Sequence, residues 1–160
     1  MDKKSKRESL FDIAGKQGGF FSAQQAVRAG YSYRLQTHNV KSGHWTRMGR
    51  GIFRMNQYPQ AEREDLIFWS LWSRNIKGEP VAVVSHESAL VVHDLSDAMP
   101  ARIHLTVPRG FQKKAPKGVI LHHKELPGTE TEERIGYRVT TPRQTLCDVA
   151  DGGPNRRVAQ

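Results

Sequence analysis

The sequence has very little cysteine: Cys147 is the only one in 160 residues. A single thiol cannot form an intramolecular disulfide, which excludes a disulfide-stapled secreted domain and fits a reducing cytoplasm. Cys147 has no partner thiol and lies among apolar residues, so we expect it to fill space in the core.

Long apolar runs are lacking as well. No run approaches the ~20 residues that a membrane-spanning helix needs, and the mean hydropathy of -0.64 is typical of a soluble globular protein. The N-terminal residues MDKKSKRES are charged, which distinguishes them from a secretory signal. We therefore expect a cytoplasmic protein with no membrane partner.

Acidic side chains are missing from one long segment: none occurs between Asp12 and Arg54. Residues 1–58 hold eleven Lys and Arg against three Asp and Glu, a charge of +8, whereas residues 59–160 hold 14 against 13, a charge of +1. A cationic excess confined to one segment is typical of a module that displaces counterions from nucleic acid. Because the segment has no large apolar face beside its charge, nucleic acid is favoured over a membrane surface.

Motifs of nucleotide- and metal-dependent enzymes are also lacking. There is no P-loop, no GxGxxG after a strand and no HExxH. The residue types of a nucleophilic triad do occur together, as Ser85, His86, His93 and Asp94. On one helix, however, Ser85 and His93 would be more than two turns apart, and Ser85 is better placed as an N-cap. We expect no catalytic activity and no cofactor.

Three histidines raise the question of a metal site. His104, His122 and His123 lie on candidate neighbouring strands, but no Cys or carboxylate falls at ligand spacing beside them. Adjacent histidines on a strand also point to opposite faces. Structural histidines are therefore favoured over metal ligands.

What the sequence does contain is a helix-turn-helix pattern between Phe20 and Arg54. Ser22 is a good N-cap for a helix over Ala23–Ala29, and Gly30 is a natural stop. Ser32 precedes a second helix, roughly Tyr33–Ser42, which Gly43 closes. Two short strands then follow, with Gly49-Arg50-Gly51 as the turn between them. Helix, turn, helix and basic hairpin is the plan of a winged helix-turn-helix, in which the second helix enters the major groove of DNA.

The second helix predicts its own DNA-binding face. Arg34, Thr37, His38 and Lys41 recur at helical spacing and share one side, whereas Leu35 and Val40 should pack on the preceding helices. An ordinary solvated face is the alternative, and the basic hairpin next to it argues against that. Tyr31 and Tyr33 either stack on sugars or close the core. The expected DNA-binding residues are Ser32, Tyr33, Arg34, Thr37, His38, Lys41, Arg47, Arg50 and Arg54.

The remainder predicts a second domain, and the fold class is α+β: a winged helix-turn-helix (1–58) followed by a small mixed α/β domain (59–160). A first helix over Ser9–Lys16 precedes Phe20 and Phe21, which should pack beneath it. The later elements are helices at Glu62–Asn75, at His86–Leu95 and from Pro142 to about Asp151, strands at Arg102–Val107, Val119–His123 and Ile135–Thr140, a short strand or lead-in at Val81–Val84, and an acidic turn at Gly128–Glu133. Residues Asn155–Gln160 look like the start of a helix too short to be stable alone.

Several of these segments resemble the AbiEi-type antitoxins, winged-helix regulators of bacterial type IV toxin–antitoxin pairs. The similarity covers about Phe20 to Asp151 and is carried by GGFFSAQQAVRAGYSY, VKSGHWTRMGRGIFR, SHESALVVHDLSDAMPARIHLTVPRG, GVILHHKEL and YRVTTPRQTLCDVAD. It implies a repressor that binds inverted repeats upstream of its own operon, an arrangement that suits a homodimer on double-stranded DNA. It also implies a second domain that neutralises a nucleotidyltransferase-like toxin, with or without stable contact.

The same pattern resembles the front part of proteins that carry a Vsr-like endonuclease domain. Such a nuclease needs an Asp and a Glu-x-Lys on adjoining strands to hold a divalent metal. No Glu-x-Lys occurs in residues 1–160. On that alternative the chain is the targeting half of a longer enzyme, and the antitoxin interpretation is favoured over it.

Overall fold

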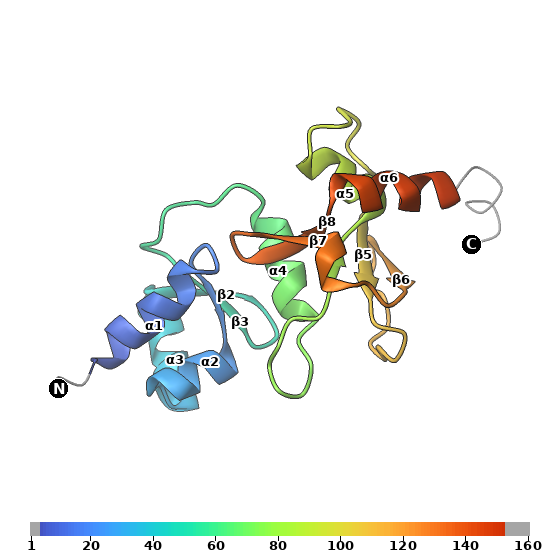
Figure 1. Ribbon diagram of the computed structural model, residues 1–160. Coiled ribbons are helices and arrows are strands. Elements are labelled where there is room, and N and C mark those ends of the chain that lie inside the picture. Colours follow the sequence, from blue (N-terminus) through green and yellow to red (C-terminus); the bar gives the residue numbers. More distant parts are fainter. Residues whose placement is uncertain (1–3, 153–160) are drawn as a thin grey trace. The chain divides into compact units, whose positions relative to one another are not determined.

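The computed structural model describes residues 4–152 and divides into two compact units, one on each side of the Pro80–Val81 bond (Figure 1). The first unit contains α1 (Lys6–Gly15), β1 (Phe20–Ser22), α2 (Ala23–Ala29), α3 (Tyr33–Lys41), β2 (Trp45–Gly49), β3 (Ile52–Met55) and α4 (Glu64–Trp72). The second contains β4 (Val83–Val84), α5 (His86–Val92), β5 (Ile103–Val107), β6 (Val119–His123), β7 (Thr131–Arg134), β8 (Tyr137–Thr140) and α6 (Pro142–Asp151). This mixed architecture confirms the predicted α+β class.

The helices of the first unit begin and end where local chemistry places them. Ser22 forms a reciprocal capping box with Gln25 at the start of α2, and Gly30 ends that helix with a left-handed φ of 111°. The Ser32 hydroxyl accepts a hydrogen bond from the backbone N–H of Leu35 at the start of α3. Helix α1 starts earlier than predicted because Ser5 caps it and accepts from the N–H of Glu8.

The predicted two-stranded ribbon is part of a three-stranded antiparallel sheet. Its order is β1-β3-β2. Strand β1 is the added edge strand, and its Phe21 lies opposite Phe53 of β3. Phe20 and Phe21 are fully buried, as predicted, but they reach the core from this strand. Helix-turn-helix followed by the β2–β3 hairpin gives the winged arrangement expected from the sequence.

Aromatic rings close the core of the first unit. The Phe21 ring meets Trp45 edge-on with centroids 4.7 Å apart, and Tyr31 meets the other side of Trp45 at 5.1 Å. Such contacts stabilise a small core beyond the area they bury. Tyr31 therefore belongs to the core, whereas Tyr33 projects into solvent.

Helix α4 packs on β1 and β3 and so belongs to the first unit. It buries Leu66, Ile67 and Leu71 and is shorter at both ends than the predicted helix. The sequence placed this helix in the second domain. The predicted division into 1–58 and 59–160 stays a prediction, and the compact units divide later in the chain.

The second unit is a five-stranded mixed sheet of order β6-β5-β4-β8-β7. β5 pairs in parallel with β6, and β4 in parallel with β8, whereas the other two neighbouring pairs are antiparallel. Helices α5 and α6 pack against each other, α5 on β5 and β8 and α6 on β8. Strand β6 and helix α6 have the predicted bounds.

Three predictions in this unit are wrong or outside the described residues. The acidic turn is only a 3₁₀ turn at Gly128–Glu130; Thr131 then begins strand β7, which forms a hairpin with β8. Cys147 is exposed rather than in the core, because α6 turns it outward. The predicted helix start at Asn155–Gln160 lies outside the described residues. Among residues 4–152, no helix combines the length and apolarity needed to cross a bilayer.

Candidate nucleic-acid interface

Helix α3 exposes the polar stripe that the sequence predicted. Arg34, Thr37, His38 and Lys41 are all exposed, and their spacing places them on one side. Within residues 4–152, the side chains of Arg34, His38 and Lys41 make no hydrogen bond or ion pair. These three side chains are therefore available to a ligand.

The opposite face of α3 differs from the prediction at one position. Leu35 is 37% exposed and is not a core residue, whereas Gln36 is only 3% exposed. Val40 packs on the core as predicted. The reason is that the side chain of Gln36 donates to the carbonyls of Ala23 (3.3 Å) and Tyr31 (3.1 Å). Buried polar groups are tolerated when they are hydrogen-bonded in this way.

Gln36 consequently fixes α3 to the start of α2 and to the turn between the two helices. Gln36 was not singled out from the sequence. Its position four residues before Val40, which packs on the core, is the signal that could have indicated an inward face.

The two residues at the start of α3 have different surroundings. Ser32 is exposed, but its hydroxyl oxygen is used as the helix cap. Tyr33 is largely exposed, and its carbonyl accepts a hydrogen bond from Thr37 Oγ1 at 3.1 Å. Both residues lie beside the polar stripe without adding charge to it.

The wing is the β2–β3 hairpin, with Arg50 exposed at its tip. Gly51 has a φ of 68°, and a Cβ there would lie 2.8 Å from Nη2 of Arg74. Arg74 Nη2 donates to the Arg50 carbonyl at 3.3 Å, and Nη1 donates to Leu71 at 2.8 Å. Arg74, which the sequence did not single out, therefore attaches the wing tip to α4. Arg47 is exposed on β2, and its Nε donates to Gly49 at 3.3 Å.

Arg54 lies apart from the other predicted DNA-binding residues. Its side chain is 13% exposed, and Nη2 lies 2.9 Å from Oε2 of Glu64. The same guanidinium donates to the carbonyls of Met55 (2.9 Å) and Tyr58 (3.0 Å). Arg54 thus connects β3 to the chain that enters α4, and its cation is already paired.

The residues of the suspected triad do not assemble into one. Ser85 occupies the N-cap position of α5, but its hydroxyl makes no capping bond, contrary to the prediction. It bonds instead to Nδ1 of His86 at 2.8 Å and accepts from Thr106 Oγ1 at 2.7 Å. His93 bonds to the Thr140 carbonyl at 2.7 Å. Asp94 is exposed after the end of the helix.

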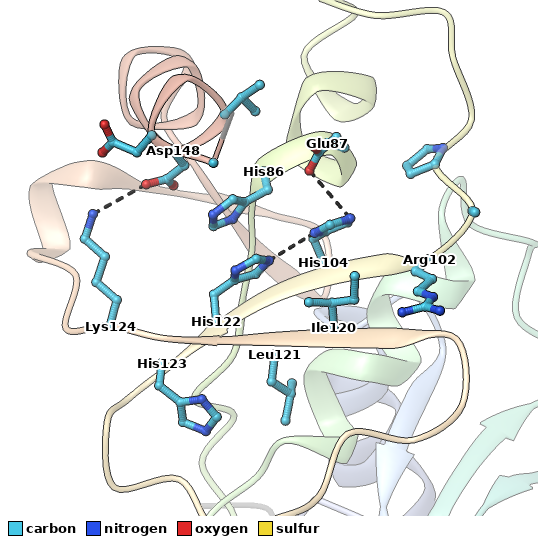
Figure 2. A pocket seen from close by; sticks show the side chains of 15 residues that line it. His86, Glu87, Arg102, His104, Ile120, Leu121, His122, His123, Lys124 and Asp148 are labelled. Atoms are coloured by element: carbon cyan, nitrogen blue, oxygen red, sulfur yellow. Dashed lines mark hydrogen bonds and ion pairs between the residues drawn. The ribbon is translucent and has the colours of Figure 1, made fainter. Parts of the chain in front are cut away.

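Two of the three strand histidines do come together. His104 Nδ1 and His122 Nε2 are 3.0 Å apart across the parallel β5–β6 pair, whereas His123 projects from the other face of β6 (Figure 2). In the part of the chain that the structure describes, no group of three or more His, Cys, Asp and Glu is arranged to hold a metal ion.

Comparison with known proteins places the first unit in context. Residues 8–56 match a family model described as "Transcriptional regulator, AbiEi antitoxin". The matched segment runs from within α1 to the end of β3 and contains both α3 and the β2–β3 hairpin. The resemblance predicted from the sequence is confirmed for this segment. No curated protein matches the chain.

Proposed function

We propose that this protein is a DNA-binding transcriptional repressor and antitoxin of a bacterial toxin–antitoxin operon. The proposal starts from the similarity of residues 8–56 to AbiEi antitoxin regulators. Helix α3 would enter the major groove of the operator and the β2–β3 wing would lie along the adjacent backbone.

The observation that carries this proposal is the exposed face of α3. It presents Arg34, His38 and Lys41 without internal partners, in a segment (residues 13–61) that contains no Asp or Glu. Guanidinium and ammonium groups bind phosphate oxygens and the acceptor edge of guanine, and this segment contributes no carboxylate that would repel DNA.

The predicted contacts fall into two kinds. Arg34 and Thr37 lie on the face directed to base edges, with His38 and Lys41 beside them. Arg47 and Arg50 on the wing would contact phosphates and position the helix without reading sequence. Ser32 and Tyr33 flank the stripe. We leave Arg54 out of the contact set because Glu64 and two carbonyls already hold its guanidinium.

The second unit would serve neutralisation of a nucleotidyltransferase-like toxin. The resemblance of the SHESAL and YRVTTPRQTL segments to AbiEi-type antitoxins supports this role, as does the separate compactness of residues 81–152. Inverted repeats in the operator would be bound by a homodimer, because a two-fold DNA site mirrors a two-fold protein.

The test is binding of the full chain to the DNA upstream of its own gene, compared with a scrambled duplex of equal length. With about five phosphate contacts, we expect the affinity to fall by a hundred- to a thousandfold between about 50 and 200 mM salt. Affinity that hardly changes over this range would contradict groove binding. When a neighbouring nucleotidyltransferase-like gene arrests the growth of its host cells, coexpression of this protein should restore that growth. Failure to restore it would contradict the antitoxin role.

A further inference from the structure

A cavity of about 890 Å³ in the second unit is not used by the proposed function. Strands β5 and β6, the start of α5 and the end of α6 surround it (Figure 2). Its polar lining includes the imidazoles of His86, His104 and His122 and the carboxylate of Asp148. Polar side chains gathered beneath two helices are unusual, because this face of a sheet ordinarily carries apolar residues.

One carboxylate oxygen of Asp148 lacks a partner among the described residues. The Asp148 side chain is 4% exposed. Oδ1 accepts from Gln144 Nε2 at 2.8 Å and lies 3.4 Å from Lys124 Nζ, whereas Oδ2 has no hydrogen-bond partner among residues 4–152. Leaving a buried carboxylate oxygen unpaired costs free energy, so a ligand that donates a hydrogen bond to it would be stabilised.

A flat aromatic wall stands beside this carboxylate. The imidazoles of His86 and His122 are stacked with centroids 3.6 Å apart and planes 11° from parallel. Burial lowers the pKa of His122 to about 4, with smaller contributions from the charges of His86 and His104. Burial also lowers the pKa of His86. At neutral pH the wall is therefore uncharged and does not repel a cation.

The first of these rings is held firmly in place. His86 has a φ of 54°, which is uncommon for a residue other than glycine and costs free energy. The hydrogen bonds from Thr106 to Ser85 and between Ser85 and His86 fix the imidazole in this conformation. A strained conformation persists only where its surroundings maintain it, and such sites are often functional.

Charge selects the kind of ligand. With the stacked imidazoles neutral, three carboxylates line the cavity: Asp148, which is buried, Glu87, whose Oε2 lies 3.5 Å from His104 Nε2, and Asp151 at the exposed end of α6. The lining cations are Lys124, whose ammonium faces Oδ1 of Asp148, and the exposed Arg102 (Figure 2). An anion would be repelled next to the unpaired oxygen, whereas a planar group with N–H donors can pair with that oxygen and lie against the imidazoles.

We propose that this cavity binds a small ligand bearing a planar amidine-type group, with Oδ2 of Asp148 accepting its N–H and the His86–His122 stack lying along its plane. A guanine base and a free guanidinium compound both present this chemistry. The lining residues all belong to the second unit, so the proposal does not rest on DNA binding by the first.

The experiment titrates the full chain with benzamidine and with benzoate, which has nearly the same shape but offers acceptors in place of donors. Calorimetry measures affinity, and the ¹⁵N shifts of the imidazoles report the location. We expect saturable one-to-one binding of benzamidine with shifts at His86 and His122, and no such binding of benzoate. Absence of benzamidine binding, or equal binding of benzoate, would overturn the proposal.

Matched variants locate the contact. Asp148→Asn should weaken benzamidine binding by roughly tenfold or more, because the ligand loses a charged acceptor, whereas Asp97→Asn, an exposed carboxylate of the same unit outside the cavity, should change little. Equal losses would show a general charge effect and would also overturn the proposal. Because Asp148→Asn changes a buried group, a second variant leaves that group intact: Ala101→Trp places a large side chain at the cavity wall and should obstruct benzamidine binding. Ala98→Trp, outside the cavity, is its control and should not.

Competition then separates the two sources. Displacement of benzamidine by guanosine monophosphate assigns the site to a guanine base, and displacement by agmatine assigns it to a guanidinium compound. If neither displaces benzamidine, the proposed class of ligand is wrong.

Discussion

At the residue scale, two arginines of the wing hairpin serve different purposes although they are only four positions apart. Arg50 is exposed at the tip, and its carbonyl, not its guanidinium, is held by Arg74. Arg54 is almost enclosed, and its guanidinium is paired with Glu64. A cation can neutralise phosphate only if its own fold leaves it unpaired, so the two side chains should respond differently to substitution.

Replacing Arg54 with Ala should lower the free energy of unfolding by about 2–3 kcal/mol, because Glu64 would lose its cation and two carbonyls their donor. Arg50→Ala should leave stability unchanged, yet weaken binding to all DNA sequences about equally and reduce the salt slope by about one unit. Urea unfolding and binding at several salt concentrations would measure both effects. Equal stability of the two variants would contradict the assignment of Arg54.

Replacing Arg34 with Ala should relax sequence preference, costing about 1–3 kcal/mol at one base pair if the contact is direct. The free energy of unfolding should not change, because the side chain of Arg34 is exposed and makes no hydrogen bond or ion pair among the described residues. Binding to a set of operators with single base-pair changes would measure the loss of preference. A large fall in melting temperature would show that this face of α3 is structural instead.

At the element scale, α3 and the wing are held by side chains outside the proposed DNA-contact set. Gln36 fixes α3 to the turn before it, and Arg74 fixes the wing tip to α4. A second contact supports the wing, since a Cβ at Gly49 would lie 2.7 Å from the Phe68 ring. The geometry of the proposed interface therefore depends on packing within the first unit.

The imidazole stack on β5, β6 and α5 should make the stability of the protein depend on pH. His122 has a folded pKa lowered to about 4 by burial, against about 6.5 in the unfolded chain. Between these values the unfolded state binds more protons, so stability is present above about pH 6.5 and is lost as the pH falls towards 4. His86, whose pKa is also lowered by burial, acts in the same direction.

Urea unfolding at pH values from 7 to 4 would test this, with His122→Phe as the variant and the exposed His38→Ala as the control. The His122→Phe protein should lose less stability on acidification than the native protein. The His38→Ala protein should lose as much as the native protein. An unchanged pH dependence in His122→Phe would show that His122 is not the responsible group.

At the scale of the whole molecule, the division after Pro80 predicts which fragment can fold. A fragment 1–80 keeps α4 and should melt cooperatively and bind DNA. A fragment 1–58 loses the burial of Leu66, Ile67 and Leu71, worth about 2 kcal/mol for each side chain, and should be largely unfolded. Circular dichroism melts of both fragments would check this, and equal melting temperatures would favour the earlier boundary.

Sequence by itself determined the features that depend on near neighbours. The bounds of α2 follow from Ser22 and Gly30, and the start of α3 follows from Ser32, because capping joins residues three or four positions apart. Composition likewise placed the cationic excess in the first 58 residues. These local signals were sufficient to predict the winged helix and the exposed stripe of Arg34, Thr37, His38 and Lys41.

Only the tertiary structure decided the features that depend on distant partners. The pairing of β1 with β3, the inward turn of Gln36 and the pairing of Arg54 with Glu64 each need a group from another element. The cavity is the clearest case, since His86, His122 and Asp148 come from α5, β6 and α6. Their spacing along the chain carries no period or motif, because their proximity arises from strand order and helix packing.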